Sequence, residues 1–142
     1  MSFADKACPV MFRDSSLRQI LAFEHPEAGV QLVKGSIEPG ESPRLAALRE
    51  LAEEAGITEA DIAHDLGTWS SQDDNQIWSL HLCTFAPKLP ETWTHHCPDD
   101  GGQELKFFWH DVHAEPGESW APKFREALRT IRERTRPLRW RG

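Results

Sequence analysis

The chain has 142 residues, of which 39% are hydrophobic and 27% are charged, and its formal net charge is −7 at pH 7. This length is most simply one domain, residues 1–142, and it is sufficient to bury a core. The acidic balance makes nucleic acid an unfavourable partner, because a phosphate backbone attracts a basic surface. No apolar run is long enough to cross a bilayer and the N-terminal residues lack the layout of a signal peptide, so we expect a cytoplasmic protein with no membrane contact.

The strands and helices are taken in chain order. Apolar runs bounded by turns predict strands over residues 8–14, 17–26, 30–35, 67–71, 76–87, 91–96 and 104–112. A helix is predicted from Pro43 to Ala55, with Ser42 as its N-cap and Gly56 as a left-handed C-terminal cap. Residues 57–65 are expected to form a loop or short turn. This order predicts an α/β protein in which a mixed sheet lies between helices.

A second helix is predicted over residues 119–134, because Phe124, Leu128 and Ile131 recur at helical spacing. Pro137 is expected to end this helix. Residues 123–141 carry eight Lys or Arg and only two Glu. This basic segment is either a solvated helix face followed by a tail, or a surface that binds an anion or a partner.

The three cysteines, Cys8, Cys83 and Cys97, are odd in number and widely spaced. Such spacing indicates neither a disulfide framework nor a zinc site, and we expect buried or idle thiols. The run His95-His96-Cys97 does not change this expectation, since adjacent ligands rarely chelate one ion and no second cluster has suitable spacing.

The first helix carries an unusual cluster of carboxylates. On a helical wheel of about 100° per residue, the apolar side is formed by Leu45, Leu48, Leu51, Ala52 and Ala55. Glu50, Glu53 and Glu54 gather on the opposite side, where like charges and the C-terminal end of the helix dipole both disfavour them. Only Arg49 is placed to relieve this repulsion. Carboxylate oxygens suit Mg²⁺, so we interpret the acidic face as a hard-cation site for a phosphate-bearing substrate.

The residues around this helix follow a known pattern: a Gly, five residues, a Glu, seven residues, and then Arg-Glu-aliphatic-any-Glu-Glu-any-Gly-aliphatic. The positions are filled by Gly35, Glu41, Arg49, Glu50, Leu51, Glu53, Glu54, Gly56 and Ile57. This stretch resembles the Nudix box of Nudix hydrolases. The resemblance implies an α/β/α sandwich, and it implies hydrolysis of a diphosphate linkage by water with the help of Mg²⁺ or Mn²⁺.

The resemblance also implies roles for single residues. Glu50, Glu53 and Glu54 would bind metal, and Glu50 or Glu54 would also help to activate water. Arg49 would brace a carboxylate, Glu41 would be a structural or secondary metal residue, and the backbone carbonyl of Lys34 would be a further ligand. Gly35 would allow the backbone to approach the metal closely, and Gly40 would allow the tight turn into the helix.

A further acidic residue is expected downstream, because many members of this family supply one from a distant loop. Glu104 resembles that element, with Asp99 and Asp100 as alternatives; a loop acid in water is equally compatible with the sequence. Trp69, Trp78, Trp93, Phe108 and Trp109 could stack on a base, although aromatic residues in strands more often belong to the core.

The leading prediction is a pyrophosphohydrolase, monomeric or homodimeric, that acts on a nucleoside diphosphate derivative such as a nucleoside triphosphate. A diadenosine-polyphosphate or capped-RNA hydrolase is the alternative within enzymes, and an inactive Nudix-like nucleotide-binding or sensing module is the alternative outside them. Family members that act on diadenosine polyphosphates tend to carry a tyrosine downstream of the box, and the chain has no tyrosine, which weakens that assignment. ADP-ribose hydrolases of the family often show a proline about sixteen residues after the glycine that corresponds to Gly56; the chain lacks it, which weakens an ADP-ribose assignment.

Overall fold

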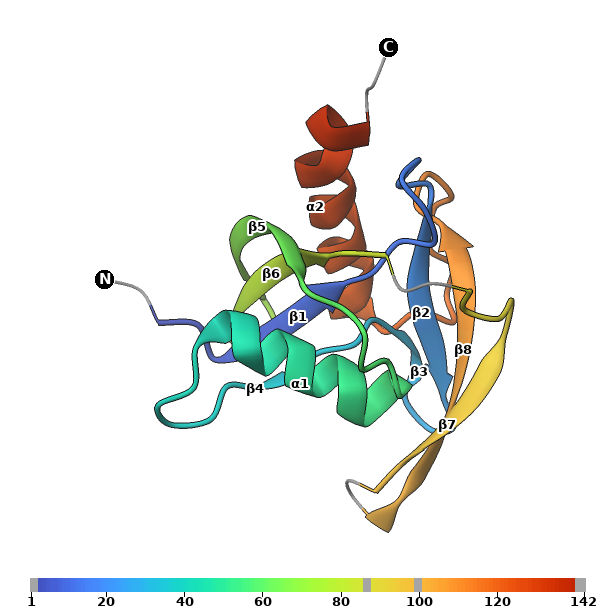
Figure 1. Cartoon of the computed structure of the whole chain (residues 1–142), viewed down its shortest axis with the longest axis horizontal. Coiled ribbons are helices and arrows are strands. Elements are labelled where there is room, and N and C mark those ends of the chain that lie inside the picture. The colour runs from blue at the N-terminus through green and yellow to red at the C-terminus, as the bar shows by residue number, and fades with distance from the viewer. Residues whose placement is uncertain (1–2, 86–87, 99–100, 140–142) are drawn as a thin grey trace.

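Ten elements follow one another within residues 3–85, 88–98 and 101–139, the part of the chain that the computed structural model describes (Figure 1). They are β1 (Lys6–Val10), β2 (Gln19–His25), β3 (Gly29–Gln31), β4 (Gly35–Ser36), α1 (Pro43–Ala55), β5 (Ile62–Ser70), β6 (Ile77–Cys83), β7 (Trp93–Cys97), β8 (Gln103–Asp111) and α2 (Pro122–Arg139).

The strands form two sheets. The first has the order β4-β1-β6-β5, and it is mixed because β1 and β6 are parallel while the other pairs are antiparallel. The second has the order β3-β2-β8-β7 and is antiparallel throughout. The predicted mixed sheet is therefore present, and the second sheet takes up the remaining strands.

The two helices cover opposite faces of the mixed sheet (Figure 1). Successive residues of a strand point to opposite faces, and β1 shows the result directly. Ala7 packs against Ala46 and Ala47 of α1, whereas its neighbour Cys8 packs in the cluster that includes residues of α2. This layering confirms the predicted α/β/α arrangement.

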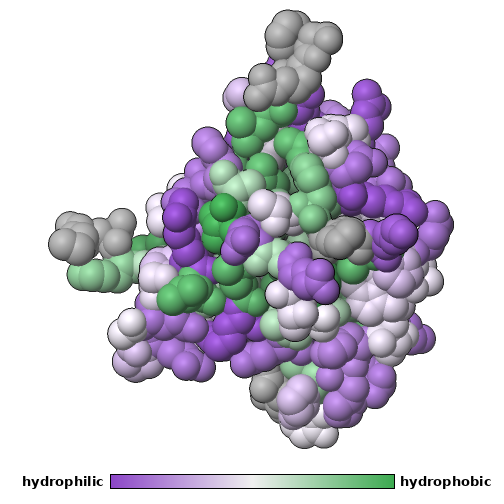
Figure 2. All heavy atoms as spheres, in the orientation of Figure 1, coloured by the Kyte–Doolittle hydropathy of each residue, from purple (hydrophilic) through white to green (hydrophobic). Residues whose placement is uncertain are grey.

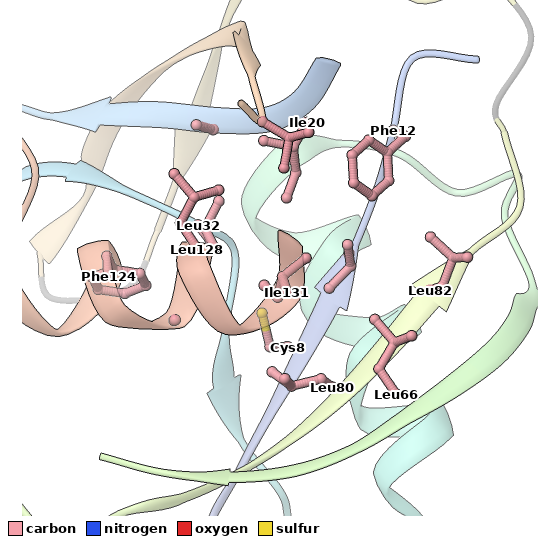
Figure 3. Close-up of a cluster of buried hydrophobic side chains, with 14 of the residues drawn as sticks. Cys8, Phe12, Ile20, Leu32, Leu66, Leu80, Leu82, Phe124, Leu128 and Ile131 are labelled. Atoms are coloured by element: carbon pink, nitrogen blue, oxygen red, sulfur yellow. The ribbon is translucent and has the colours of Figure 1, made fainter. Parts of the chain in front are cut away.

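The largest core cluster lies between α2 and the two sheets. Phe124, Leu128 and Ile131 are each no more than 1% exposed, as their helical spacing predicts. Figure 3 shows these side chains on α2 near Cys8 of β1 and Leu32, the residue that follows β3. This packing fixes α2 against the sheets.

A buried polar chain lies on the α1 side of the mixed sheet. Ser79 pairs in register with Ala7, and its Oγ lies 2.7 Å from His81 Nε2. His81 Nδ1 lies 2.8 Å from Asp65 Oδ1, and Arg44 Nε of α1 donates to both oxygens of Asp65 at 3.2 Å. Ser79 and His81 are 8% and 4% exposed, whereas the side chains of Asp65 and Arg44 are 50% and 58% exposed. The hydrogen bonds run from the interior to the surface and tie α1 to β5 and β6.

Three predicted element boundaries are wrong. The predicted strand over residues 8–14 ends at Val10, the one over 30–35 is divided into β3 and β4, and residues 62–65 of the predicted loop belong to β5. The register of β5 against β6 shifts twice within this strand. Such bulges interrupt the two-residue alternation by which a strand is recognised. Residues 86–87, at the end of another predicted strand, lie outside the described residues.

The prediction that Pro137 ends the second helix is also wrong, since α2 continues to Arg139. A proline removes one backbone donor from the helix, and two nearby side chains bind carbonyls of this region. Thr135 Oγ1 donates to the carbonyl of Ile131 at 2.8 Å, and Arg139 Nη2 donates to the carbonyl of Arg132 at 2.7 Å. These bonds hold the last turns together.

The surface is mixed in character. Figure 2 shows hydrophilic residues around the rim of one face and hydrophobic residues nearer its middle. Leu45 is the most exposed leucine that the structure describes, at 61%. No helix within the described residues has both the length and the apolar character that crossing a membrane requires.

Candidate active site

A cavity of about 570 Å³ opens beside α1 and β4. Its lining includes Glu50, Glu53 and Glu54 of α1 together with Lys34 and Gly35 at the start of β4. Segments far apart in the chain therefore meet here, and the structure brings together most of the site residues that the sequence predicts.

The ends of α1 place its carboxylates at this cavity. Ser42 Oγ accepts a hydrogen bond from the Leu45 N–H at 3.2 Å. At the other end Gly56 has a φ of 76°, and its N–H donates to the carbonyl of Ala52 at 3.0 Å. Both caps and the bounds Pro43–Ala55 are as predicted.

The orientation of α1 about its own axis differs from the prediction. The buried residues are Ala46, Ala47, Glu50, Leu51 and Ala55, whereas the wheel placed Leu45 in the core and Glu50 opposite it. The small Ala46 and Ala47 pack against Ala7, which rotates Leu45 outwards to 61% exposure and turns Glu50 inwards to 6%. Glu50 is thus a buried carboxylate at the edge of the cavity.

Gly35 makes room for this carboxylate. A Cβ atom added to Gly35 would overlap the carboxyl group of Glu50. The backbone of β4 and the Glu50 side chain therefore lie closer than any other residue at position 35 would allow. The sequence predicted that Gly35 lets the backbone approach a metal closely; in the structure the group that lies against Gly35 is the carboxyl group of Glu50.

Arg49 organises the carboxylates around it. Its guanidinium donates to both oxygens of Glu41, at 2.7 and 2.9 Å. It also donates to Glu50 Oε1 at 2.9 Å, to Glu53 Oε2 at 3.3 Å and to the carbonyl of Ser36 at 2.8 Å. These hydrogen bonds raise the pKa of Arg49, and the bond with Glu41 has the largest effect. Arg49 thus bonds with three carboxylates, which are the contacts that its predicted bracing role requires.

The pair formed by Arg49 and Glu41 predicts a pH-dependent stability. The hydrogen bonds from Arg49 lower the pKa of Glu41 to about 2. A depressed carboxylate pKa contributes stability that is complete above the unfolded-state value of about 4.3 and is lost as the pH falls towards the folded-state value. The Tm of Glu41→Gln should therefore lie below that of the wild type at pH 7, with the gap narrowing below pH 4. A gap that is constant between pH 7 and pH 3 would contradict this assignment.

Lys34 brings a positive charge to the cavity. Its ammonium lies 5.5 Å from the ring centroid of Trp78 and 5.9 Å from that of Phe124. Burial, followed by the charges of Lys123 and Lys6, lowers the pKa of Lys34. Lys6 also lines the cavity. The sequence predicted only a backbone role for Lys34, because no local pattern shows where its side chain points.

Other lining residues come from the ends of strands and were not predicted. They are Phe23 and His25 of β2, Gln31 of β3, and Gln103 and Leu105 of β8. None belongs to a motif, and their only signal is the alternation along each strand, which cannot reveal that these ends meet. The aromatic residues considered for base stacking do not line this cavity.

Glu104 is not brought to the cavity. Gln103 and Leu105 line it, so the intervening side chain points to the other face of β8. There the Glu104 carboxylate lies 2.7 Å from His96 Nδ1. The prediction of Glu104 as a metal ligand does not fit this position, and its alternatives Asp99 and Asp100 lie outside the described residues.

We expect Glu104→Gln to change kcat by less than about twofold, because its side chain points away from the cavity and its contact with His96 is exposed, a kind of contact worth little. Steady-state kinetics on one substrate would measure this. A loss of kcat comparable to that of a change at Glu50 would show that the β7–β8 hairpin rearranges to bring Glu104 to the substrate.

The three cysteines are buried, and one of them, Cys97 at the end of β7, lines the cavity. Cys8, Cys83 and Cys97 are free and buried, as predicted. Burial raises the pKa of Cys83 to about 12 and raises the pKa of Cys8 as well, so these thiols stay protonated near neutral pH.

The donor atoms at the cavity suit a hard divalent cation, because three carboxylates and a backbone carbonyl offer only oxygen. The close fit of Gly35 over Glu50 also keeps a carbonyl-bearing strand beside a buried carboxylate. Within the described part of the chain, no group of three or more His, Cys, Asp or Glu side chains is close enough to hold one ion. The residue types therefore fit such an ion, and the carboxylates must converge to bind it.

Comparison with known proteins identifies the family of the chain and agrees with the fold. Residues 6–131 match the NUDIX domain family, and the chain therefore belongs to the Nudix family. An RNA pyrophosphohydrolase from Bartonella quintana is 30% identical over 118 residues, which cover 70% of this chain and 68% of that protein.

Two shorter matches have higher identity. Nudix hydrolase 25 from Arabidopsis thaliana is 44% identical over 43 residues, 30% of this chain and 25% of that protein. An ADP-ribose pyrophosphatase from Haemophilus influenzae is 41% identical over 58 residues, 37% of this chain and 27% of that protein. The matched part of the chain thus spans about a quarter of the length of these two relatives.

Solved structures share the fold at low sequence identity. A UDP-X diphosphatase superimposes with a TM-score of 0.69 at 15% identity, over 100% of this chain and 66% of that one. An ADP-ribose pyrophosphatase from Streptococcus suis superimposes with a TM-score of 0.63 at 14% identity, over 92% of this chain and 90% of that one. These likenesses concern the fold.

Proposed function

We propose that the protein hydrolyses the pyrophosphate linkage of a small nucleoside diphosphate derivative. The observation that carries the proposal is that Glu50, Glu53 and Glu54 line the same cavity as the cations Lys6 and Lys34. A diphosphate needs positive charge around its oxygens, and an attacking water needs a carboxylate to accept its proton. This cavity offers both.

The residues divide the reaction between them. The oxygen of water forms a bond to one phosphorus, the bond from that phosphorus to the bridging oxygen breaks, and the bridging oxygen leaves with the other phosphate. Glu54 is our candidate for the acceptor of the water proton, because Glu50 is buried and held by Arg49. The ammonium groups of Lys6 and Lys34 stabilise the negative charge that develops on the leaving phosphate.

Glu50, Glu53, Glu54 and the carbonyl of Lys34 would hold Mg²⁺ or Mn²⁺. Such an ion, when bound, offsets charge on phosphate oxygens and lowers the pKa of a bound water. Arg49 then has a second task, since it keeps Glu41 and the backbone of Ser36 fixed beside these ligands.

The remainder of the cavity accommodates the groups attached to the diphosphate. Phe23 and Leu105 offer apolar contact, while His25, Gln31 and Gln103 offer hydrogen-bond donors and acceptors. A lining of this kind suits a base or a sugar, whose faces are apolar and whose edges are polar. The volume of about 570 Å³ is typical of a site for one small molecule.

A panel of substrates tests the proposal. Nucleoside triphosphates, ADP-ribose, UDP-sugars and dinucleoside polyphosphates would each be incubated with Mg²⁺ or Mn²⁺, and the products would be identified by mass. A 5′-triphosphate RNA belongs in the panel because of the 30% identity to an RNA pyrophosphohydrolase. Cleavage between two phosphates of at least one compound is the expected result.

A nucleotide-binding module without activity is the competing function. It would bind a compound of the panel, as seen by calorimetry, and form no product under any of the metal conditions. The cavity is lined by the motif residues Gly35, Arg49, Glu50, Glu53 and Glu54. This favours the enzyme, because a module that only binds a nucleotide has no need of a water-activating carboxylate.

Divalent metal should raise the Tm by several degrees, since an ion at about 100 times its Kd stabilises the folded state by about 2.7 kcal/mol. Scanning calorimetry with Mg²⁺ or Mn²⁺ near pH 8 would measure the shift. The double variant Glu50→Gln/Glu54→Gln serves as the control, and most of the metal-induced rise in Tm should be lost in it. An equal shift in both proteins would place the ion elsewhere.

A further inference from the structure

A second cavity, of about 850 Å³, lies beside the last turns of α2. We call it the basic groove. Its charged lining consists of Arg18, which immediately precedes β2, and of Arg132, Glu133, Arg136 and Arg139 of α2. Four guanidinium groups and one carboxylate thus share one concave surface, on a protein whose overall formal charge is −7.

The arginines of the groove are poorly neutralised. Arg132 and Arg129 share the carboxylate of Glu115: Arg132 Nη1 lies 3.3 Å from one of its oxygens, and Arg129 Nη2 lies 3.0 Å from the other. Arg136 Nη1 lies 3.8 Å from Glu133 Oε2. Arg139 donates to neutral oxygens of Thr135 and Arg132. Among the residues that the structure describes, Arg18 and Arg139 form no ion pair. Burial, followed by the charges of Arg132 and Arg136, lowers the pKa of Arg139.

Helix stability explains only part of this arrangement. Cations near a helix C-terminus interact favourably with the helix dipole, which accounts for arginines at the end of α2. Arg132 and Arg136, however, are four residues apart, a spacing at which like charges repel. The dipole also gives no reason for Arg18, which reaches the same groove from a different element. A bound anion would account for both features.

The basic groove is separate from the candidate active site. Arg18 adjoins the first residue of β2, whereas His25 ends this strand and lines the active-site cavity. At about 3.3 Å per residue, the two positions are roughly 20 Å apart. The antiparallel strand β8 shows the same separation, since Gln103 at its start lines the active-site cavity and His113, just beyond its end, lines the groove. One small nucleotide cannot reach both.

We propose that the basic groove is a second binding site, which takes a compact polyphosphate chain. Guanidinium groups bind phosphate oxygens through paired, charge-assisted hydrogen bonds. Four of them around one groove match several linked phosphates better than a single anion. A long nucleic acid would meet the acidic remainder of the surface, so a short chain is the better fit. This site is independent of the hydrolysis proposed above.

Titration calorimetry with sodium tripolyphosphate as the probe tests the proposal. The titration uses Glu50→Gln protein in EDTA at low salt, so that turnover does not contribute heat. One tripolyphosphate should bind per chain, and Arg18→Gln and Arg136→Gln should each weaken binding by about tenfold. Arg136 is 76% exposed and Arg18 is exposed, so both variants are expected to keep the wild-type Tm.

Arg44→Gln is the matched control, because it removes the same charge from α1, where Arg44 is exposed and lines neither cavity. It should bind tripolyphosphate as the parent does. Absence of binding, or equal weakening in the groove and control variants, would overturn the proposal. A single-stranded RNA without 5′ phosphates forms the last arm; tighter binding of this RNA than of tripolyphosphate, abolished by Arg18→Gln, would show that the groove serves nucleic acid instead.

Discussion

Glu50→Gln is expected to lower kcat by about 10²–10⁴-fold and to leave the fold intact. The amide has the size of the carboxyl group and keeps an oxygen that can accept the hydrogen bond from Arg49 Nη1. It removes the negative charge that a metal and the phosphate chemistry need. Kinetics on a substrate found with the panel, together with the Tm of each protein, would measure both effects.

Glu59→Gln provides the matched control for this variant, because Glu59 is an exposed glutamate just beyond α1 that lies outside the cavity. Its kcat should equal that of the wild type. Full activity in Glu50→Gln would mean that the buried carboxylate at the cavity has no part in turnover, and the proposed assignment of the site would be wrong.

The second large effect is expected for Gly35→Ala. The added Cβ would overlap the Glu50 carboxyl group, so either β4 or the Glu50 side chain must move. Overpacking of this kind costs about 1–3 kcal/mol, and displacement of Glu50 should lower kcat by at least about 10²-fold. Chemical denaturation and kinetics on the same preparation would measure the two losses.

Gly117→Ala is the control for the backbone effect of the same substitution, since a Cβ at Gly117 would meet no atom within 4 Å. Its stability and kcat should stay close to those of the wild type. A Gly35→Ala protein with wild-type kcat would show that Glu50 need not lie against β4 for the reaction.

Much of the candidate site can be predicted from the sequence, because its signals are local. Ser42 and Gly56 define the ends of α1 through their own backbone chemistry, and the spacing of the three glutamates places them near one another on a helix. The rotation of α1 is not local. It depends on Ala46 and Ala47 packing against Ala7 of a distant strand, which is why a helical wheel misplaces Leu45 and Glu50.

The features that escaped prediction depend on contacts between distant segments. Glu104 stands next to two cavity residues in sequence, yet the pleat of β8 turns it towards His96. The bulges in β5 break its alternation, and α2 continues past Pro137 to Arg139, whose side chain donates to the carbonyl of Arg132. The charge of the C-terminal segment was evident from the sequence, but not that Arg18 joins it.

The most direct test of the central claim is to follow the reaction in oxygen-18 water. A nucleoside diphosphate derivative that the panel identifies would be incubated with Mg²⁺, and the oxygen-18 content of each product would be measured by mass spectrometry. If water attacks phosphorus at this site, one of the two phosphate products carries a single oxygen-18 and the other carries none, and in Glu50→Gln the label appears about 10²–10⁴-fold more slowly. Binding of nucleotide without labelled product, or label appearing at an equal rate in Glu50→Gln, would contradict the assignment of this cavity as a pyrophosphohydrolase site.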